Sequence, residues 1–147
     1  MINENPIPIT ELRVGNWIDC TFIQNYRERA QILEIRKQDD PDNPHVISIK
    51  PNIGYSLNIC YPIYITPAML LRFGFKNLHG NLYTIATDTA YPVSVDFTED
   101  GVKLWLGKRN VRNWRQLELH RLQNLCEDLA GITLQLQPKP EEKECQC

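Results

Sequence analysis

The sequence predicts an α+β domain that is mostly antiparallel β, with a short central helix and an amphipathic C-terminal helix followed by a closing strand. Short segments in which apolar and polar residues alternate recur along the chain, separated by turn-forming residues, a pattern typical of antiparallel strands. One late segment instead repeats leucines at the spacing of a helix. The 147 residues fit one domain, since domains typically hold about 100–150 residues. We expect that domain over residues 1–137 and a polar tail over residues 138–147.

Four short strands are expected in the N-terminal half of the chain. In the first of them, Ile18, Cys20 and Phe22 share one face, as in a half-buried strand, and Gly15-Asn16 forms a turn before it. The other three strands are expected over residues 30–36, 46–50 and 53–60. Short strands joined by tight turns favour a curled sheet or an SH3-like barrel in this half.

A short helix is expected to follow Thr66. Thr66 is a favoured N-cap residue, Pro67 suits the first helical position, and Gly74 suits the left-handed position after the last turn. Three apolar side chains of this segment are expected mainly in the core: Leu70, Leu71 and Phe73.

Three further strands are expected over residues 82–87, 93–98 and 102–106. The last two form a hairpin, because the Asp100-Gly101 pair between them tolerates the positive φ that such turns need.

The C-terminal helix is expected to begin near Asn113, with Gln116 in the capping-box position, and to end at Gly131. Its apolar stripe consists of Leu119, Leu122, Leu125, Cys126 and Leu129. Apolar and polar residues alternate over residues 132–137, which predicts the closing strand.

Composition and cysteine usage predict a cytoplasmic protein without membrane spans. No stretch approaches the roughly 20 apolar residues that cross a bilayer, and the first residues do not resemble a signal peptide. Five cysteines without an export signal form a poor disulfide framework, so Cys20, Cys60 and Cys126 are expected to be free, apolar thiols. Cys145 and Cys147 offer two thiolates to a soft metal, but a tetrahedral site needs four ligands. We therefore predict no metal and no cofactor.

Three segments are distinctive in their order and spacing: Glu11 to Ile18, Pro62 to Pro67 followed by Leu71 to Phe75, and Leu119 to Leu125. On these segments, residues 11–136 resemble a family of short, uncharacterised proteins encoded in prophages and mobile elements of anaerobic gut bacteria. The resemblance implies a phage or mobile-element setting and no particular activity. In that family the helix motif usually continues with aromatic residues, where this chain has Cys126-Glu127, and this departure weakens the case for a shared role of the helix surface.

One stretch of the sequence is cationic. Residues 108–123 hold five basic residues and one acidic residue, although the whole chain has a net charge of −2. The candidate nucleic-acid-binding residues in it are Lys108, Arg109, Arg112, Trp114 and Arg115. Cations bind phosphates by releasing counterions, and an indole can stack on an unpaired base. Arg112 and Arg115 flank the expected start of the helix, where the helix dipole disfavours positive charge, so a function other than helix stability is indicated. The alternative is a solvated loop with Trp114 packed under the sheet.

His120, Asn124 and Glu127 are expected on the helix face opposite the leucines. A histidine with a carboxylate can act as a general acid–base pair, but a convex, solvated helix face is a poor place for catalysis. Ordinary polar surface or a hydrogen-bonding interface is the preferred interpretation. Since the sequence also lacks known catalytic motifs, no catalytic residue is predicted.

These observations together predict a non-catalytic binding or interaction module in a phage or mobile-element context, with a protein or a nucleic acid as its partner. One alternative is nucleic-acid binding through residues 108–115. The other is a structural or assembly component of a phage particle, which would require a sizeable apolar patch and a defined oligomer.

Overall fold

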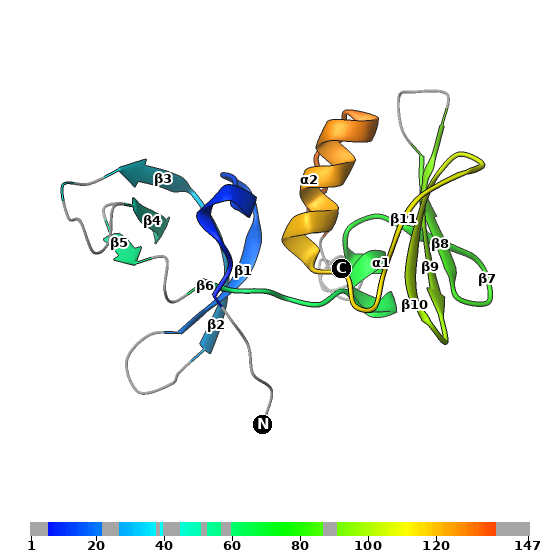
Figure 1. Ribbon diagram of the computed structural model, residues 1–147, viewed down its shortest axis with the longest axis horizontal. Helices are drawn as coiled ribbons and strands as arrows, with labels where there is room; N and C mark the ends of the chain where they lie inside the picture. The colour runs from blue at the N-terminus through cyan, green and yellow to red at the C-terminus, as the bar shows by residue number, and fades with distance from the viewer. Residues whose placement is uncertain are drawn as a thin grey trace, which may run out of the picture. The chain divides into compact units, whose positions relative to one another are not determined.

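The computed structural model describes residues 6–21, 27–37, 39, 45–50, 53–56, 60–86 and 91–137 (Figure 1). The predicted α+β class with mostly antiparallel strands is confirmed. The chain divides into two compact units, Met1–Ile63 with Glu118–Asn124, and Tyr64–Leu117 with Leu125–Cys147. The expectation of one domain over residues 1–137 stays a prediction. Phe22, the tail over residues 138–147 and its two cysteines lie outside the described residues.

Unit 1 contains a 3-10 helix, η1 (Ile9–Glu11), and two antiparallel three-stranded sheets. The strands are β1 (Trp17–Thr21), β2 (Arg27–Gln31), β3 (Glu34–Lys37), β4 (His45–Lys50), β5 (Ile53–Ser56) and β6 (Cys60–Tyr61). Their order is β2-β1-β6 in one sheet and β3-β4-β5 in the other. Because no ladder of the described residues joins the two sheets, an SH3-like barrel in this half stays a prediction.

The core of unit 1 lies against β1. Ile18 and Cys20 alternate with half-buried residues along this strand and are 0% exposed, as the period-two pattern predicts. Cys60 on β6 is the direct cross-strand partner of Cys20, and both are free thiols. The hydrogen bond with Cys20 and burial raise the pKa of the Cys60 thiol. Cys126 is likewise free and buried, so all three thiols behave as the small apolar side chains that were predicted.

The single strand expected over residues 30–36 is wrong, because the chain changes partner within it. The amide of Ile32 still donates to the carbonyl of Asn16, at 2.9 Å, beside β1. Leu33 then turns outward and is 48% exposed, and β3 pairs with β4 instead. An apolar run alone does not reveal such a change of partner.

In unit 2, α1 (Pro67–Arg72) confirms the predicted helix and its ends. The Thr66 hydroxyl accepts a hydrogen bond from the amide of Met69, at 3.2 Å. Gly74 adopts φ of 93°, as expected of the residue after the last turn. Leu70 and Phe73 are buried as predicted, but Leu71 is 51% exposed, so its core assignment is wrong.

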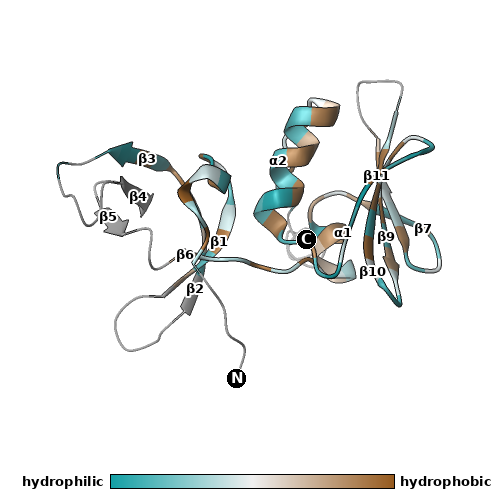
Figure 2. Ribbon diagram, viewed as in Figure 1, coloured by the Kyte–Doolittle hydropathy of each residue, from teal (hydrophilic) through white to brown (hydrophobic). Residues whose placement is uncertain are grey.

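A five-stranded antiparallel meander forms the sheet of unit 2, in the order β11-β10-β9-β8-β7. Its strands are β7 (Lys76–His79), β8 (Leu82–Ile85), β9 (Val93–Thr98), β10 (Gly101–Leu106) and β11 (Arg109–Trp114). One face is apolar and includes Val93, Val95 and Leu104, which are at most 3% exposed. Leu125, Cys126 and Leu129 of α2 (Leu119–Ala130) line a small cavity with sheet residues that include Val93 and Leu104, as predicted for the apolar stripe. Figure 2 shows brown, apolar segments on these strands and on this part of α2.

Three strands and one helix boundary differ from expectation. The sequence patterns do not indicate β6, β7 and β11 as separate strands, and α2 begins at Leu119 rather than near Asn113. Residues 109–114 pair with β10 instead of starting the helix, because a ladder to a neighbouring strand satisfies their backbone groups better than an isolated first helical turn would.

The closing strand predicted over residues 132–137 is also wrong. This segment forms no strand among the described residues. Its backbone amides donate instead to the helices α2 and α1. The amide of Ile132 donates to Cys126, at 3.2 Å, and the amide of Gln137 donates to Arg72 at the end of α1, at 2.6 Å. None of the described helices is both long and apolar enough to cross a membrane.

Candidate nucleic-acid interface

The cationic stretch forms the edge of the sheet of unit 2. β11 pairs with β10 on one side only, so its other side presents backbone groups and side chains to solvent. Its neighbouring turn and its ends carry four exposed cationic side chains: Lys108, Arg109, Arg112 and Arg115. Within the described ranges, the ion pairs present involve other side chains. The predicted cations are therefore exposed, and no acid of the described residues forms an ion pair with them.

Trp114 is not the exposed indole that the sequence suggested. Its ring is half-buried, and its Nε1 is buried without a hydrogen-bond partner among the described residues. The guanidinium carbon of Arg112 lies 5.5 Å from the ring centroid, in cation–π contact. Arg112 thus covers a face of the Trp114 ring, which makes that ring a poor stacking surface for a base.

The helix dipole does not act on Arg112 and Arg115, so the expectation that it disfavours them is wrong. Arg112 lies in β11, and Arg115 follows that strand, four residues before α2 begins at Leu119. Neither side chain stands in the first turn of a helix, so the dipole does not disfavour either charge. Arg115 lines a hollow of about 750 Å³ together with Glu99 and Asp100. Because these acids oppose a phosphate, we place Arg115 at the weaker end of the cationic surface.

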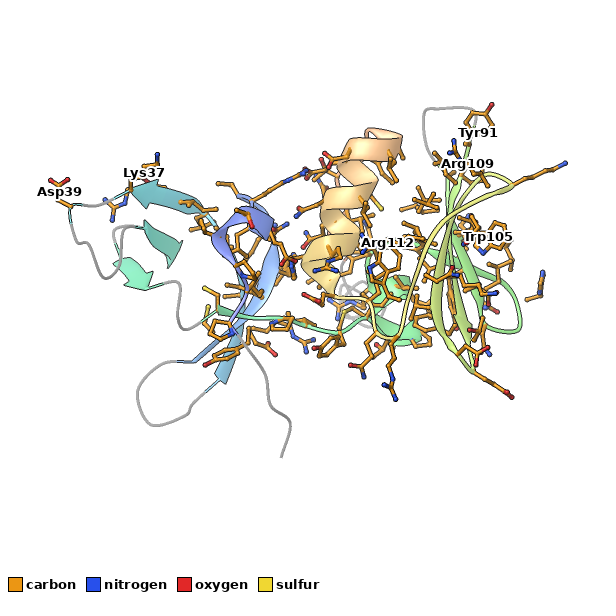
Figure 3. The ribbon with its side chains drawn as sticks, viewed as in Figure 1. Lys37, Asp39, Tyr91, Trp105, Arg109 and Arg112 are labelled. Carbon is orange, nitrogen blue, oxygen red and sulfur yellow. The ribbon has the colours of Figure 1, made fainter. Side chains whose placement is uncertain are left out.

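An exposed aromatic ring that no sequence pattern indicated lies beside the turn formed by Gly107 and Lys108, which we call the Lys108 turn. Tyr91 is 58% exposed, and a Cβ atom on Gly107 would lie 2.8 Å from its ring. Both this close approach and the φ of 61° favour glycine at position 107. Figure 3 shows Tyr91 and Arg109 at the same end of the sheet.

His120 is buried rather than on a solvated helix face, so the expected exposure of this polar face is wrong. His120 is 0% exposed and faces two carboxylates. Its Nε2 lies 3.2 Å from Oε1 of Glu11 and 3.4 Å from Oε2 of Glu118. Arg121 completes the cluster, with its Nη2 2.6 Å from the same oxygen of Glu11. We call these four residues the Glu11 cluster.

Charge and hydrogen bonding within the Glu11 cluster act on its carboxylate. Nε2 of His120 faces carboxylate oxygens, which only accept, so it donates to them, while Nδ1 has no partner among the described residues. Burial alone raises the pKa of Glu11, but hydrogen bonds from Arg121 and His120, and their charge, outweigh burial and lower it below its ordinary value of 4.5. The hydrogen bond to Glu11 likewise raises the pKa of Arg121.

Other polar residues near the start of α2 also form hydrogen bonds within unit 1. Asn124 donates to the carbonyl of Glu11, at 2.8 Å, and accepts from the Asn16 side chain, at 2.9 Å. Gln123 accepts from the amide of Trp17, at 2.8 Å. Glu127 belongs to unit 2, apart from these residues; it is half-buried and is not without an interaction partner. The hydrogen-bonding alternative for this face therefore holds for His120 and Asn124.

The ligand atoms of Glu11, Glu118 and His120 lie within 4.8 Å of one another, close enough to share a metal ion. Two observations oppose that use. Arg121 already supplies the positive charge that the carboxylates need, and a metal-bound histidine normally donates its second ring nitrogen to a partner, which Nδ1 lacks among the described residues. The cluster is best explained as a structural ion network.

Comparisons with known proteins give no family assignment: no family model, no curated protein and no solved structure matches the chain.

Proposed function

We propose that the protein is a non-catalytic binding module whose partner is a nucleic acid, contacted along β11 and the Lys108 turn. One observation carries the proposal. Lys108, Arg109 and Arg112 lie on a sheet edge, exposed and without an ion pair among the described residues, where a phosphate backbone can follow the strand. The proposed setting is phage or mobile-element associated and cytoplasmic, and it is supported by the resemblance of residues 11–136 and the composition.

The physical basis is counterion release. Each cation that neutralises a phosphate frees a condensed counterion, so affinity falls linearly with the logarithm of salt concentration. Since the whole chain has a net charge of −2, long-range attraction to a polyanion is weak, and binding depends on this local surface. We expect dissociation constants of about 10⁻⁴–10⁻⁶ M, the range of sequence-independent binding.

The test is fluorescence anisotropy of short labelled oligonucleotides, titrated at several salt concentrations. The double variant Arg109→Ala/Arg112→Ala is expected to weaken binding and to reduce the salt slope by about 1.5, since each lost phosphate contact removes about 0.7–0.9. Arg36→Ala/Lys37→Ala is the matched control, because it removes two exposed cations elsewhere, on β3. The control is expected to bind as the wild type does. No anisotropy change for the wild type at low salt would refute the proposal.

A further inference from the structure

The sheet of unit 2 has a second face that its helices leave open, and the register defines it. Two cross-strand rows run over all five strands on this face. The first row is Lys76, Thr84, Ser94, Trp105 and Asn110, and the second is His79, Leu82, Asp96, Lys103 and Asn113. We call these ten residues the open face. Figure 3 shows Trp105 on the opposite side of the sheet from Arg112, as this register requires.

The composition of the open face differs sharply from that of the apolar face. Of its ten residues only Trp105 and Leu82 are apolar, and only Ser94 is buried. Ser94 is not an unsatisfied group, because its hydroxyl donates to Thr84, at 3.1 Å. A sheet face that packed against another layer would be lined with apolar residues, as the face with Val95 and Leu104 is. The open face is therefore a solvated, polar surface with one large aromatic ring in its middle.

We infer that the ligand is single-stranded nucleic acid, which lies along the edge of this sheet with a base stacked on Trp105. The inference rests on the proposed function and names the class of nucleic acid. Trp105 is half-buried and belongs to β10, one strand inward from β11, so its strand lies about 4.8 Å from the edge strand. A backbone that follows β11 can therefore turn its bases onto Trp105.

The β-bulge in β11 places cationic and amide side chains of this strand on different faces of the sheet. The register shift between Leu104 and Trp105 leaves Val111 without a direct partner. Consequently Arg112 lies on the helix side of the sheet, opposite Leu104, while Asn110 lies on the open face, opposite Trp105. The cations thus reach phosphates past the edge, and the amides of Asn110 and Asn113 reach base edges on the open face.

The charge of the open face fits this ligand. It carries two lysines, Lys76 and Lys103, against the single acid Asp96, and the cations of β11 lie along its border. A duplex does not suit this surface, because both faces of each paired base are covered by stacking, and a broad sheet does not enter the major groove. Unpaired bases offer their rings to an aromatic side chain.

Anisotropy with a single-stranded oligonucleotide and with a hairpin duplex of related sequence tests the inference. We expect the wild type to prefer the single strand. Trp105→Leu is expected to weaken single-strand binding about 5- to 100-fold, the range found when a stacking aromatic is removed, and to leave the salt slope unchanged. Trp105→Phe is expected to retain most of the affinity, since phenyl also stacks.

A second measurement keeps Trp105 in place. In the variant Trp17→Phe/Trp114→Phe, Trp105 is the remaining indole of the three in the chain, and a stacked base is expected to quench its fluorescence. Equal binding of both probes, or single-strand binding without quenching, would overturn the inference while leaving the cationic contacts of the proposed function intact. Absence of binding to either probe at low salt would instead overturn the proposed function itself.

Discussion

Glu11 is the residue on which the buried polar cluster of unit 1 depends. Its Oε1 accepts from both His120, at 3.2 Å, and Arg121, at 2.6 Å. Arg121 keeps a second, longer contact to Glu118, at 3.7 Å, but His120 has no solvent exposure at all. Removing the negative charge of Glu11 therefore leaves a buried ring and a partly buried guanidinium with a weakened acceptor.

We expect Glu11→Gln to lower the free energy of unfolding by about 1–3 kcal/mol, the usual result of leaving a buried polar group poorly paired. Urea denaturation followed by circular dichroism measures this change. Glu34→Gln is the control, because Glu34 pairs with Arg36 at 3.6 Å while both side chains are 56% exposed. It is expected to change stability by less than about 0.5 kcal/mol. Equal effects of the two variants would show that the Glu11 cluster contributes no more to the free energy of unfolding than an exposed ion pair does.

The lowered pKa of Glu11 gives a pH dependence with a definite sign. A carboxyl whose pKa is lower in the folded state stabilises the fold above its unfolded value of 4.5 and loses that effect as the pH falls through the folded value. Among the described residues, the titratable or charged groups facing it are Glu118, His120 and Arg121. The stability difference between wild type and Glu11→Gln is therefore expected to be constant just above pH 4.5 and to shrink below it. Urea titrations at a series of acidic pH values measure this, and a difference that grows on acidification would contradict it.

At the scale of elements, the β9–β10 hairpin depends on a glycine. Gly101 has φ of 134°, and a Cβ atom there would collide with the backbone carbonyl of Trp114 at the end of β11. The turn and the edge strand therefore share one close backbone contact.

We expect Gly101→Ala to destabilise the protein by at least about 1–3 kcal/mol, through backbone strain and the displacement of β11 from β10. Gly80→Ala is the matched control, because Gly80 also has positive φ, 54°, but nothing lies within 4 Å of its Cβ position. The control is expected to lose only about 1 kcal/mol. Thermal unfolding of both variants measures the difference, and similar melting temperatures would argue against the contact.

The elements that the sequence predicts correctly are those with local signals. α1 has its cap in Thr66 and its end in Gly74, and the β9–β10 hairpin has Asp-Gly between two alternating strands. β11 has no such signal, because Arg109–Trp114 is mostly polar and becomes a strand only by pairing with β10. Strand propensity is a weak guide where pairing with a neighbouring strand decides whether a segment forms a strand.

The candidate site could be predicted in part for the same reason. The cations of residues 108–115 are visible as composition, and they are exposed as expected. Trp105 could also have been found, since Leu104 and Leu106 alternate with it and place it on the opposite face. The Glu11 cluster could not, because Glu11 and His120 are 109 residues apart in sequence, and no local pattern indicates that they meet.

At the scale of the whole molecule, α2 belongs to both compact units. Its residues up to Asn124 are counted with unit 1, and those from Leu125 with unit 2. Leu119 and Leu122 are buried in the first part, and Cys126 and Ala130 in the second. Neither unit keeps its full core if this helix melts, so the two units are expected to unfold together despite the division of their contacts.

The tryptophans report on the units separately, because Trp17 lies in unit 1 while Trp105 and Trp114 lie in unit 2. In Trp17→Phe only unit 2 fluoresces through indoles, and in Trp105→Phe/Trp114→Phe only unit 1 does. Within each variant, we expect the urea midpoint from fluorescence to coincide with that from far-UV circular dichroism, since one transition involves the whole chain.

Leu122→Ala, which truncates a side chain that is 0% exposed, is expected to destabilise the protein by about 2–5 kcal/mol and to shift the urea midpoints of both tryptophan reporters equally. Because Leu122 is counted with unit 1, a shift confined to the Trp17 signal would mean that the units unfold independently and that the chain holds two domains.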